Sequence, residues 1–420
     1  AMEPAYYRRA AREYFAGRVH ADAFAGGTDR ARLRARVLPT PSADDRSRDP
    51  DDGEGEPVAE VLRSAAPRAA LIARPGGGKT TTLLQHALAL AEDDGGPLPV
   101  YVQLRDLDGG YTDLEQLIVE SMQQVVPEAT RKDLTDGAWA LLLDGVNERV
   151  EKGDPFARLL ANFPRTRMVF TTREPSAHFG QQIELLPLAA ADRDALIAAW
   201  IPAQAAALQQ RLAADARLGE LSRTPLLLAL LCDTTRGGLE PASTRAALIR
   251  ASLERHAVRY AEKVRTDARA PGRVDGWLAA LAHGMLRRGA LRIDLADAAD
   301  IVRVAPRAPV DPEDSLRHLT KFHLLALSGL DVVEFVHPLI QEFYAAQHLR
   351  GVGSLPDRRT LIREYVNSTL WTEPLRLFAE ECDEPTIATH LVDATRDVDA
   401  ILAARLVGSF PAQLQPALLA

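Results

Sequence analysis

A run of three glycines followed by a lysine and three threonines constrains the fold of this chain more than any other feature. The run, Arg74 to Thr82, lies between an apolar, strand-like segment at 69–72 and a segment whose apolar residues recur at helical spacing. Consecutive glycines let backbone N–H groups turn inward around phosphate oxygens, and the start of a helix adds unpaired donors and a positive dipole. The order of strand, glycine loop and helix therefore predicts a phosphate-binding loop, with its helix beginning at Lys79.

Each residue of this loop has an expected partner on a nucleoside triphosphate. The loop residues expected to bind the nucleotide are Pro75, Gly76, Gly77, Gly78, Lys79, Thr80 and Thr81. We expect Lys79 to reach the β- and γ-phosphates, Thr80 to ligate Mg²⁺ and Thr81 to lie by the α-phosphate. The usual pattern has one more glycine, at the position of Ala73, so this position does not require a strongly positive φ here. A glycine-rich turn before an ordinary helix is the plainer alternative.

A second apolar run ends in a carboxylate. Residues 138–143 are apolar and are followed by Asp144, which places an acid at the carboxyl end of a buried strand, where parallel sheets bind ligands. We expect Asp144 to hold Mg²⁺ through its water shell and Glu148 to orient or deprotonate the attacking water. Asn147 cannot act as a base. The structural alternative is a strand that ends in an ordinary Asp-Gly turn.

A third apolar run, 167–172, ends in Arg173. A guanidinium is always charged and offers a planar fork of donors to phosphate oxygens, so Arg173 is the candidate sensor of the γ-phosphate. The alternative is a surface arginine that follows a strand. The three runs together predict one ligand-binding edge of a sheet.

Beyond the loop, three stretches of the chain resemble the NACHT family of signal-transduction ATPases, within the STAND class that includes the NLR-like immune receptors. Residues 144–148 read Asp-Gly-Val-Asn-Glu, where NACHT proteins typically show Asp-Gly-x-Asp-Glu. Residues 224–232 resemble a proline-led helix, and Pro225 matches the proline that packs near the adenine in the family. Residues 335–346 match Phe-x-His-x-x-x-Gln-Glu-Phe-x-Ala-Ala, a resemblance that makes His337 the nucleotide-sensing residue.

Both later motifs also have a plainer explanation. Pro225 suits the first turn of any helix. The run after His337 puts Leu339, Phe343 and Ala346 on one face, as in an ordinary core helix, and a histidine at a helix start is usually structural. The family spacing, together with the capacity of histidine to change charge near neutral pH, supports a nucleotide role for His337 as strongly as the structural role. No histidine pairs with cysteines or carboxylates at metal-ligand spacing, so we expect no zinc site.

Composition is typical of a cytosolic regulator. The net charge of −8 gives no global attraction to nucleic acid or to an anionic membrane. The two cysteines, Cys232 and Cys382, do not form a disulfide framework, which fits a reducing compartment. No apolar stretch approaches the ~20 residues that a membrane span needs, and no signal peptide is evident in residues 1–25. We therefore expect a cytoplasmic protein with no membrane and no nucleic-acid partner.

The expected fold class is α/β, a P-loop NTPase parallel sheet followed by a helical lid, a winged-helix domain and C-terminal helices. The strands of the sheet are expected at 69–72, 98–102, 138–143, 167–173 and 183–186. The expected divisions are an N-terminal helical segment and acidic linker at 1–66, the P-loop nucleotide-binding domain at 67–188, the lid at 189–268, the winged helix at 269–350, and a helical region at 351–420 that begins a repeat sensor continuing beyond Ala420.

Two stretches refine this division. Residues Tyr6 to Arg36 are expected to be helical, with their arginines on a solvated face, and Pro41 to Pro57 is expected to be a linker. From Trp277 to Arg350 the order is a helix, a short strand at 291–293, two helices and a pair of apolar runs. That order suits a winged helix.

The resemblance implies a switch that responds to ATP or ADP. It would bind ATP with Mg²⁺, hydrolyse it slowly, form a homo-oligomer when an unknown ligand or protein activates it, and act in bacterial antiviral defence. Asn147 weakens the acidic pair and favours slow turnover. Three alternatives stay open: a P-loop enzyme of another class such as a kinase or transport ATPase, a nucleotide-bound scaffold that never turns over, and a DNA-binding regulator that uses the winged helix.

Overall fold

The computed structural model has two compact units, Ala1–Arg236 and Gly237–Ala420. The structure describes residues 3–21, 33–38, 55–74, 76–104, 114–135, 137–146, 156–172, 179–240, 242–263, 271–306, 308–320, 324–328 and 331–419. Each unit has its own core, so each is described by itself. The finer division into five segments stays a prediction.

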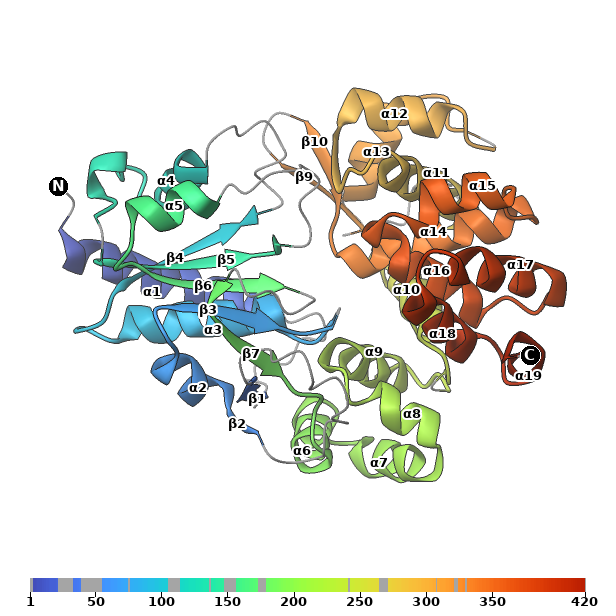
Figure 1. Ribbon diagram of the computed structural model, residues 1–420, viewed down its shortest axis with the longest axis horizontal. Helices are drawn as coiled ribbons and strands as arrows, with labels where there is room; N and C mark the ends of the chain where they lie inside the picture. The colour runs from blue at the N-terminus through green and yellow to red at the C-terminus, as the bar shows by residue number, and fades with distance from the viewer. Residues whose placement is uncertain are drawn as a thin grey trace. The chain divides into compact units, whose positions relative to one another are not determined.

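A seven-stranded sheet forms the centre of the first unit, in the order β2-β1-β7-β3-β6-β5-β4 (Figure 1). Five of its strands are parallel: β3 (Arg68–Ile72), β4 (Leu98–Gln103), β5 (Trp139–Asp144), β6 (Arg167–Thr172) and β7 (Gln181–Leu185). All five lie where the apolar runs predicted them. Their continuous apolar character is typical of parallel strands that helices cover on both faces. The predicted α/β fold class is confirmed.

Helices cover both faces of the sheet. Helix α3 (Lys79–Glu92) follows β3, and α4 (Leu114–Gln123) and α5 (Phe156–Asn162) follow β4 and β5. The chain moves across the sheet in opposite directions after β3 and after β4, so right-handed crossovers put α3 on one face and α4 and α5 on the other. Helix α1 (Pro4–Ala21) packs beside α3 (Figure 1).

The prediction that Tyr6 to Arg36 is helical throughout is wrong in its last part. Helix α1 ends at Ala21, and β1 (Arg34–Val37) pairs antiparallel with β7. Leu33 and Ala35 are buried while Arg34 is exposed, which is the alternation of a strand with one buried face. Strand β2 (Glu56–Pro57) pairs with β1 in turn. The open edge of β7 offers backbone partners, and tertiary pairing therefore decides the conformation of this segment.

The arginines of α1 were predicted to lie on a solvated face, and the structure shows that not all of them do. Arg8 is only 8% exposed, and its guanidinium donates to the carbonyl oxygens of Leu90 at 2.8 Å and Gly96 at 2.6 Å. Arg12 donates to the carbonyl oxygen of Ala91 at 2.7 Å. These carbonyls lie at and just beyond the C-terminal end of α3, where intrahelical partners run out and the helix dipole is negative. Helix α1 therefore caps the helix that follows the glycine loop.

The rest of the first unit is helical. After β7 come α6 (Ala190–Trp200), α7 (Ala205–Ala214), α8 (Ala216–Leu221) and α9 (Pro225–Arg236), and a short helix, α2 (Val58–Ser64), precedes β3. The change from alternating strands and helices to helices alone follows Pro187, as the sequence predicts. In α9 the side chains of Leu228, Leu231 and Cys232 are fully buried, which anchors the helix that begins at Pro225.

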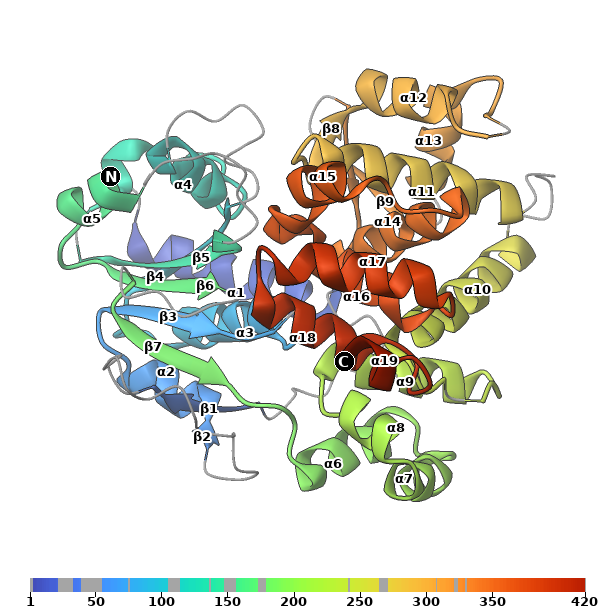
Figure 2. The same ribbon diagram turned by 45° about the vertical axis from the view of Figure 1, so that its right-hand side comes forward.

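The second unit combines helices with a small antiparallel sheet in the order β8-β10-β9 (Figure 2). Its helices are α10 (Arg245–Lys263), α11 (Pro271–Arg287), α12 (Leu295–Arg303), α13 (Pro312–Thr320), α14 (Pro338–Val352), α15 (Arg358–Leu361), α16 (Thr372–Glu380), α17 (Pro385–Arg396), α18 (Ala400–Ser409) and α19 (Gln415–Leu419). The strands are β8 (Arg292–Asp294), β9 (Leu325–Ser328) and β10 (Val332–Phe335). Helices α11 to α13 with this sheet give the winged-helix order that the sequence predicts.

Helix α14 is buried along most of its length. Leu339, Phe343 and Ala346 are buried, as the core-helix pattern predicts, and Ile340 and Tyr344 beside them are buried too. Among the helices that the structure describes, none combines the length and the apolar character that crossing a membrane would demand.

Candidate functional site

The glycine loop has the backbone geometry that its sequence predicts. Gly76 and Gly78 have positive φ angles of 72° and 93°, a region that residues with a Cβ rarely adopt. Gly78 is the N-cap of α3, so the helix begins at Lys79, as predicted. Ala73 has no positive φ, which explains why the position tolerates a residue other than glycine.

The loop also has no room for larger side chains at its centre. A Cβ on Gly77 would lie 2.9 Å from the Cβ of Ala73 and 2.9 Å from the carbonyl oxygen of Arg74. A Cβ on Gly78 would lie 2.7 Å from the side chain of Leu33, in the segment that leads into β1. Packing as well as backbone conformation thus requires glycine here, and the N-terminal segment contributes to that packing.

Lys79 lies with its ammonium group against the loop. Its Nζ donates to the carbonyl oxygen of Ala73 at 2.7 Å and to that of Arg74 at 3.3 Å. The half-buried ammonium is therefore held beside the backbone amides that would surround the phosphates. Thr81 follows in the first turn of α3 and is also half-buried.

The structure brings together the two residues predicted to hold a metal ion. The Thr80 hydroxyl, in the first turn of α3, donates to Oδ2 of Asp144 at the end of β5, at 2.7 Å. Hydroxyl and carboxylate oxygens are the hard ligands that Mg²⁺ prefers, with water and phosphate oxygens completing its coordination. The donor set therefore fits a Mg²⁺ ion, which Thr80 and Asp144 would hold.

Two further hydroxyl groups fix Asp144, and the sequence analysis missed both. Thr171 in β6 donates to Oδ1, and its own oxygen accepts the backbone N–H of Gly145 at 2.7 Å. Tyr101 in β4 donates to Oδ2 at 2.8 Å. Both residues lie near the carboxyl ends of strands that flank β5, and that placement is the signal that could have found them.

Several predicted residues lie outside the described residues. They are Pro75, Asn147, Glu148 and Arg173. The strands that precede them, β5 and β6, end at the same edge of the sheet as the glycine loop. The roles assigned to Glu148 and Arg173 stay predictions.

The start of α9 lies at the glycine loop. The backbone N–H of Leu226 donates to the carbonyl oxygen of Gly76 at 3.2 Å. The ring of Pro225 comes within 3.9 Å of the position that a Cβ on Gly78 would occupy. Residues 150 positions apart in the sequence thus meet at one place, and the nucleotide role of Pro225 stays a prediction.

His337 belongs to the second unit, where it is the N-cap of α14. Its Nδ1 accepts the backbone N–H of Leu339 at 3.0 Å. An imidazole nitrogen accepts only when it carries no proton, so the neutral ring has its proton on Nε2 in this arrangement. The sequence allowed a structural role and a nucleotide role for His337. The capping contact is the structural role, and the nucleotide role stays a prediction.

Solved structures with a similar arrangement are distant in sequence. A Walker-type ATPase of Pyrococcus abyssi is 13% identical with a TM-score of 0.30, over 68% of this chain and 93% of that chain. Cdc6p from Pyrobaculum aerophilum is 14% identical with a TM-score of 0.27, over 69% and 91%. A STAND protein with a tetratricopeptide repeat sensor from Pyrococcus horikoshii is 14% identical with a TM-score of 0.36, over 89% of this chain and 54% of that chain. No protein-family model and no curated protein matches the sequence.

The sheet, the glycine loop and the contact between Thr80 and Asp144 together give the chain an α/β fold of the P-loop NTPase type. Helices follow the seven-stranded sheet along the chain.

Proposed function

We propose that this protein is an ATP/ADP-dependent switch of the NACHT type, within the STAND class. The observation that carries the nucleotide site is the 2.7 Å contact between Thr80 and Asp144 at the mouth of the glycine loop. A hydroxyl at the start of the loop helix and a carboxylate on a neighbouring strand are what a Mg²⁺-nucleotide requires from the protein. The three NACHT-like stretches of sequence support the narrower class.

The residues of the first unit have separate tasks in this proposal. Backbone amides of the glycine loop bind the phosphates, and Lys79 places its charge by the β- and γ-oxygens. Thr80 and Asp144 would hold Mg²⁺, which supplies charge neutralisation at the phosphates when bound. Glu148 orients or deprotonates the attacking water, and Arg173 senses the γ-phosphate.

The hydrolysis is proposed to be slow and regulatory. A switch needs a long-lived triphosphate state, and Asn147 removes the second acid of the pair that NACHT proteins typically have. Pro225 would pack near the adenine, a role that the position of its helix start beside the glycine loop supports. ATP would favour an open form that assembles into a homo-oligomer, because the two nucleotides bind the two states with different affinity.

The biological setting is the part of the proposal that depends on family resemblance alone. We propose a role in bacterial antiviral defence in the cytoplasm, with a trigger of unknown chemistry. His337 would contact the ADP phosphate in a closed, inactive state. No nucleic-acid partner is proposed, because the net charge of −8 opposes binding to a polyanion.

Substitution of the loop lysine tests the nucleotide site. Lys79→Ala removes the charge beside the phosphates, and we expect ATP and ADP affinity to fall about 100-fold or more, since two charge-assisted hydrogen bonds are lost. Lys132→Ala, at an exposed lysine, is the matched control and should bind as the parent does. Isothermal calorimetry measures both. Equal affinity of Lys79→Ala and parent would contradict the loop assignment.

Two further measurements separate the proposed switch from its alternatives. Mass analysis of the purified protein identifies the co-purified nucleotide, and a multiple-turnover assay measures phosphate release. A switch retains ADP or ATP and releases phosphate slowly. Bound nucleotide with no release indicates a scaffold, and fast release that depends on an acceptor substrate indicates another class of P-loop enzyme.

A further inference from the structure

The carboxylate of Asp144 is held by three hydroxyl groups from three different elements. Thr80 on α3 and Tyr101 on β4 both donate to Oδ2, at 2.7 Å and 2.8 Å, and Thr171 on β6 donates to Oδ1. A hydroxyl oxygen can ligate a metal ion through a lone pair while its O–H still donates to a carboxylate. Thr80 and Tyr101 together therefore fix Oδ2, and of these two only Thr80 is itself proposed as a metal ligand.

The position of Tyr101 follows from strand register. Tyr101 pairs with Leu142 in the parallel ladder of β4 and β5, and Asp144 lies two residues further along β5 on the same face. The phenol is 5% exposed, so its ring fills the core while its hydroxyl reaches the ligand-binding edge of the sheet. A buried tyrosine normally places its hydroxyl on a partner, and the partner here is the carboxylate that would hold Mg²⁺.

Helix α1 covers the other side of this tyrosine. The guanidinium of Arg18 lies 5.3 Å from the centre of the Tyr101 ring, within the range of a cation–π contact. Arg18 also donates to the hydroxyl of Tyr14 at 2.6 Å, one turn earlier on α1. The N-terminal helix is therefore connected to the carboxylate of Asp144 through two side chains, Arg18 and Tyr101.

We propose that Tyr101 is a positioning residue for Asp144 and that α1 holds Tyr101 through Arg18. This inference rests on the proposed nucleotide function. Groups that orient a metal-binding carboxylate typically change metal affinity by about 10- to 100-fold when they are removed. Tyr101 thus sets how tightly Mg²⁺ binds together with the nucleotide, while the affinity for nucleotide without metal depends on the glycine loop.

The experiment compares nucleotide binding with and without metal in Tyr101→Phe. Calorimetric titration with ATP is carried out in EDTA and at a series of Mg²⁺ concentrations. We expect the affinity for ATP in EDTA to stay unchanged. The Mg²⁺ concentration that produces half of the metal-dependent increase in ATP affinity should rise roughly 10-fold. The substitution keeps the ring and removes one hydroxyl, so thermal melting should show a folded protein.

Tyr7→Phe is the matched control. Tyr7 is a buried tyrosine of α1 whose hydroxyl donates to the carbonyl oxygen of Pro99 on β4 at 3.0 Å, away from Asp144. This variant also loses the hydrogen bond of one buried tyrosine hydroxyl, but to a backbone carbonyl of β4 and not to the carboxylate of Asp144 on β5. We therefore expect its Mg²⁺ dependence to match that of the parent. Arg18→Gln should shift the Mg²⁺ dependence in the same direction as Tyr101→Phe by roughly two- to fivefold, because a cation–π contact contributes less than the hydroxyl.

The outcomes distinguish this inference from the proposed function. A parent protein whose nucleotide affinity does not respond to Mg²⁺ would overturn both. A responsive parent with an identical response in Tyr101→Phe would overturn the positioning role alone. Equal losses of affinity in EDTA and in Mg²⁺ would show a general structural defect and would also reject it.

Discussion

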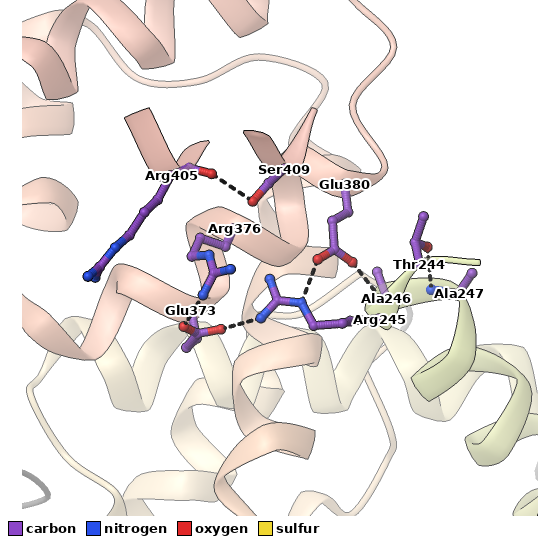
Figure 3. Close-up of polar contacts among 9 residues, drawn as sticks. All are labelled: Thr244, Arg245, Ala246, Ala247, Glu373, Arg376, Glu380, Arg405 and Ser409. Atoms are coloured by element: carbon purple, nitrogen blue, oxygen red, sulfur yellow. Dashed lines mark hydrogen bonds and ion pairs between the residues drawn. The ribbon is translucent and has the colours of Figure 1, made fainter. Parts of the chain in front are cut away.

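Two polar clusters in this molecule hold their carboxylates in opposite ways. In the first unit, Asp144 is held by hydroxyl groups that carry no charge. In the second unit, Arg245 of α10 lies between Glu373 and Glu380 of α16, at 2.7 Å and 2.6 Å (Figure 3). Neutral donors orient a carboxylate and leave its charge for a cation, whereas arginines neutralise it. The first arrangement suits a binding site, and the second suits a permanent connection between helices.

The electrostatics of the second cluster agree with a structural role. Burial lowers the pKa of Arg245, but the carboxylates of Glu380 and Glu373 outweigh burial and raise the pKa above its usual range. Burial raises the pKa of Glu373, yet Arg376 and Arg245 hold it below its usual range. Each charged form is thus stabilised by its neighbours. At a pH above the pKa that it has in the unfolded chain, Glu373 is charged, and its ion pairs stabilise the folded state. This contribution to stability is lost as the pH falls through the lowered pKa of Glu373 in the folded protein.

Removal of the central arginine should have the largest effect on stability. Arg245→Met keeps the approximate length of the side chain and leaves two buried carboxylates without their shared partner, and we expect the second unit to lose about 3–5 kcal/mol. Urea denaturation measures the change. Nucleotide affinity in the folded protein should stay close to that of the parent if the two clusters have separate roles.

An exposed ion pair provides the control for this prediction. Arg303 and Asp300 are 58% and 63% exposed, and Arg303→Met should cost less than about 1 kcal/mol. Adding Glu380→Gln to Arg245→Met should recover part of the lost stability, since one uncompensated charge is removed. A loss in Arg245→Met no larger than in Arg303→Met would refute the distinction between the clusters.

ATP hydrolysis should respond to a substitution near Asp144 in the sequence that leaves ATP binding intact. Glu148→Gln removes the proposed base, and we expect phosphate release to fall roughly 100-fold while ATP affinity is retained. A single-turnover assay with radiolabelled ATP measures both quantities on one sample.

Asn147→Asp is the complementary change at the preceding residue of the sequence. It restores the acid pair that NACHT proteins typically have, so phosphate release should rise above that of the parent. Unchanged release in both variants would remove residues 147 and 148 from the catalytic step.

The sequence predicted the parts of the site that local pattern determines. The five parallel strands were predicted from apolar runs, and β3 and β5 end at the edge of the sheet where Thr80 meets Asp144. The spacing therefore placed Lys79, Thr80 and Asp144 at this edge, and their binding roles stay predictions. The loop glycines were found for the same reason, since a positive φ at Gly76 and Gly78 is a local requirement.

The parts that were missed depend on long-range register. Tyr101 is 43 residues from Asp144 in sequence, and Arg8 is 82 residues from Leu90. Nothing in helical or strand periodicity says which tyrosine lies beside which carboxylate, or which arginine reaches the end of another helix. The same holds for β1, whose strand conformation comes from pairing with β7 rather than from its own composition.

The smallest expected effect concerns His337 and sharpens the question of its role. His337→Ala removes both the N-cap acceptor and the imidazole, so we expect a loss of about 1 kcal/mol in stability. If the ring also contacts the ADP phosphate, ADP release should become roughly 10-fold faster, because one charge-assisted hydrogen bond is lost, and oligomers should form without a trigger. Fluorescent ADP release and light scattering measure these two changes.

His337→Asn separates capping from nucleotide sensing. Asparagine is a favoured N-cap residue, so this variant keeps the acceptor for the backbone N–H of Leu339 and should melt as the parent does. It lacks the imidazole, whose Nε2–H would be the donor to a phosphate while Nδ1 caps the helix. Fast ADP release in both variants therefore identifies a sensor. Parent-like release in His337→Asn together with fast release in His337→Ala would mean that His337 acts only by starting α14.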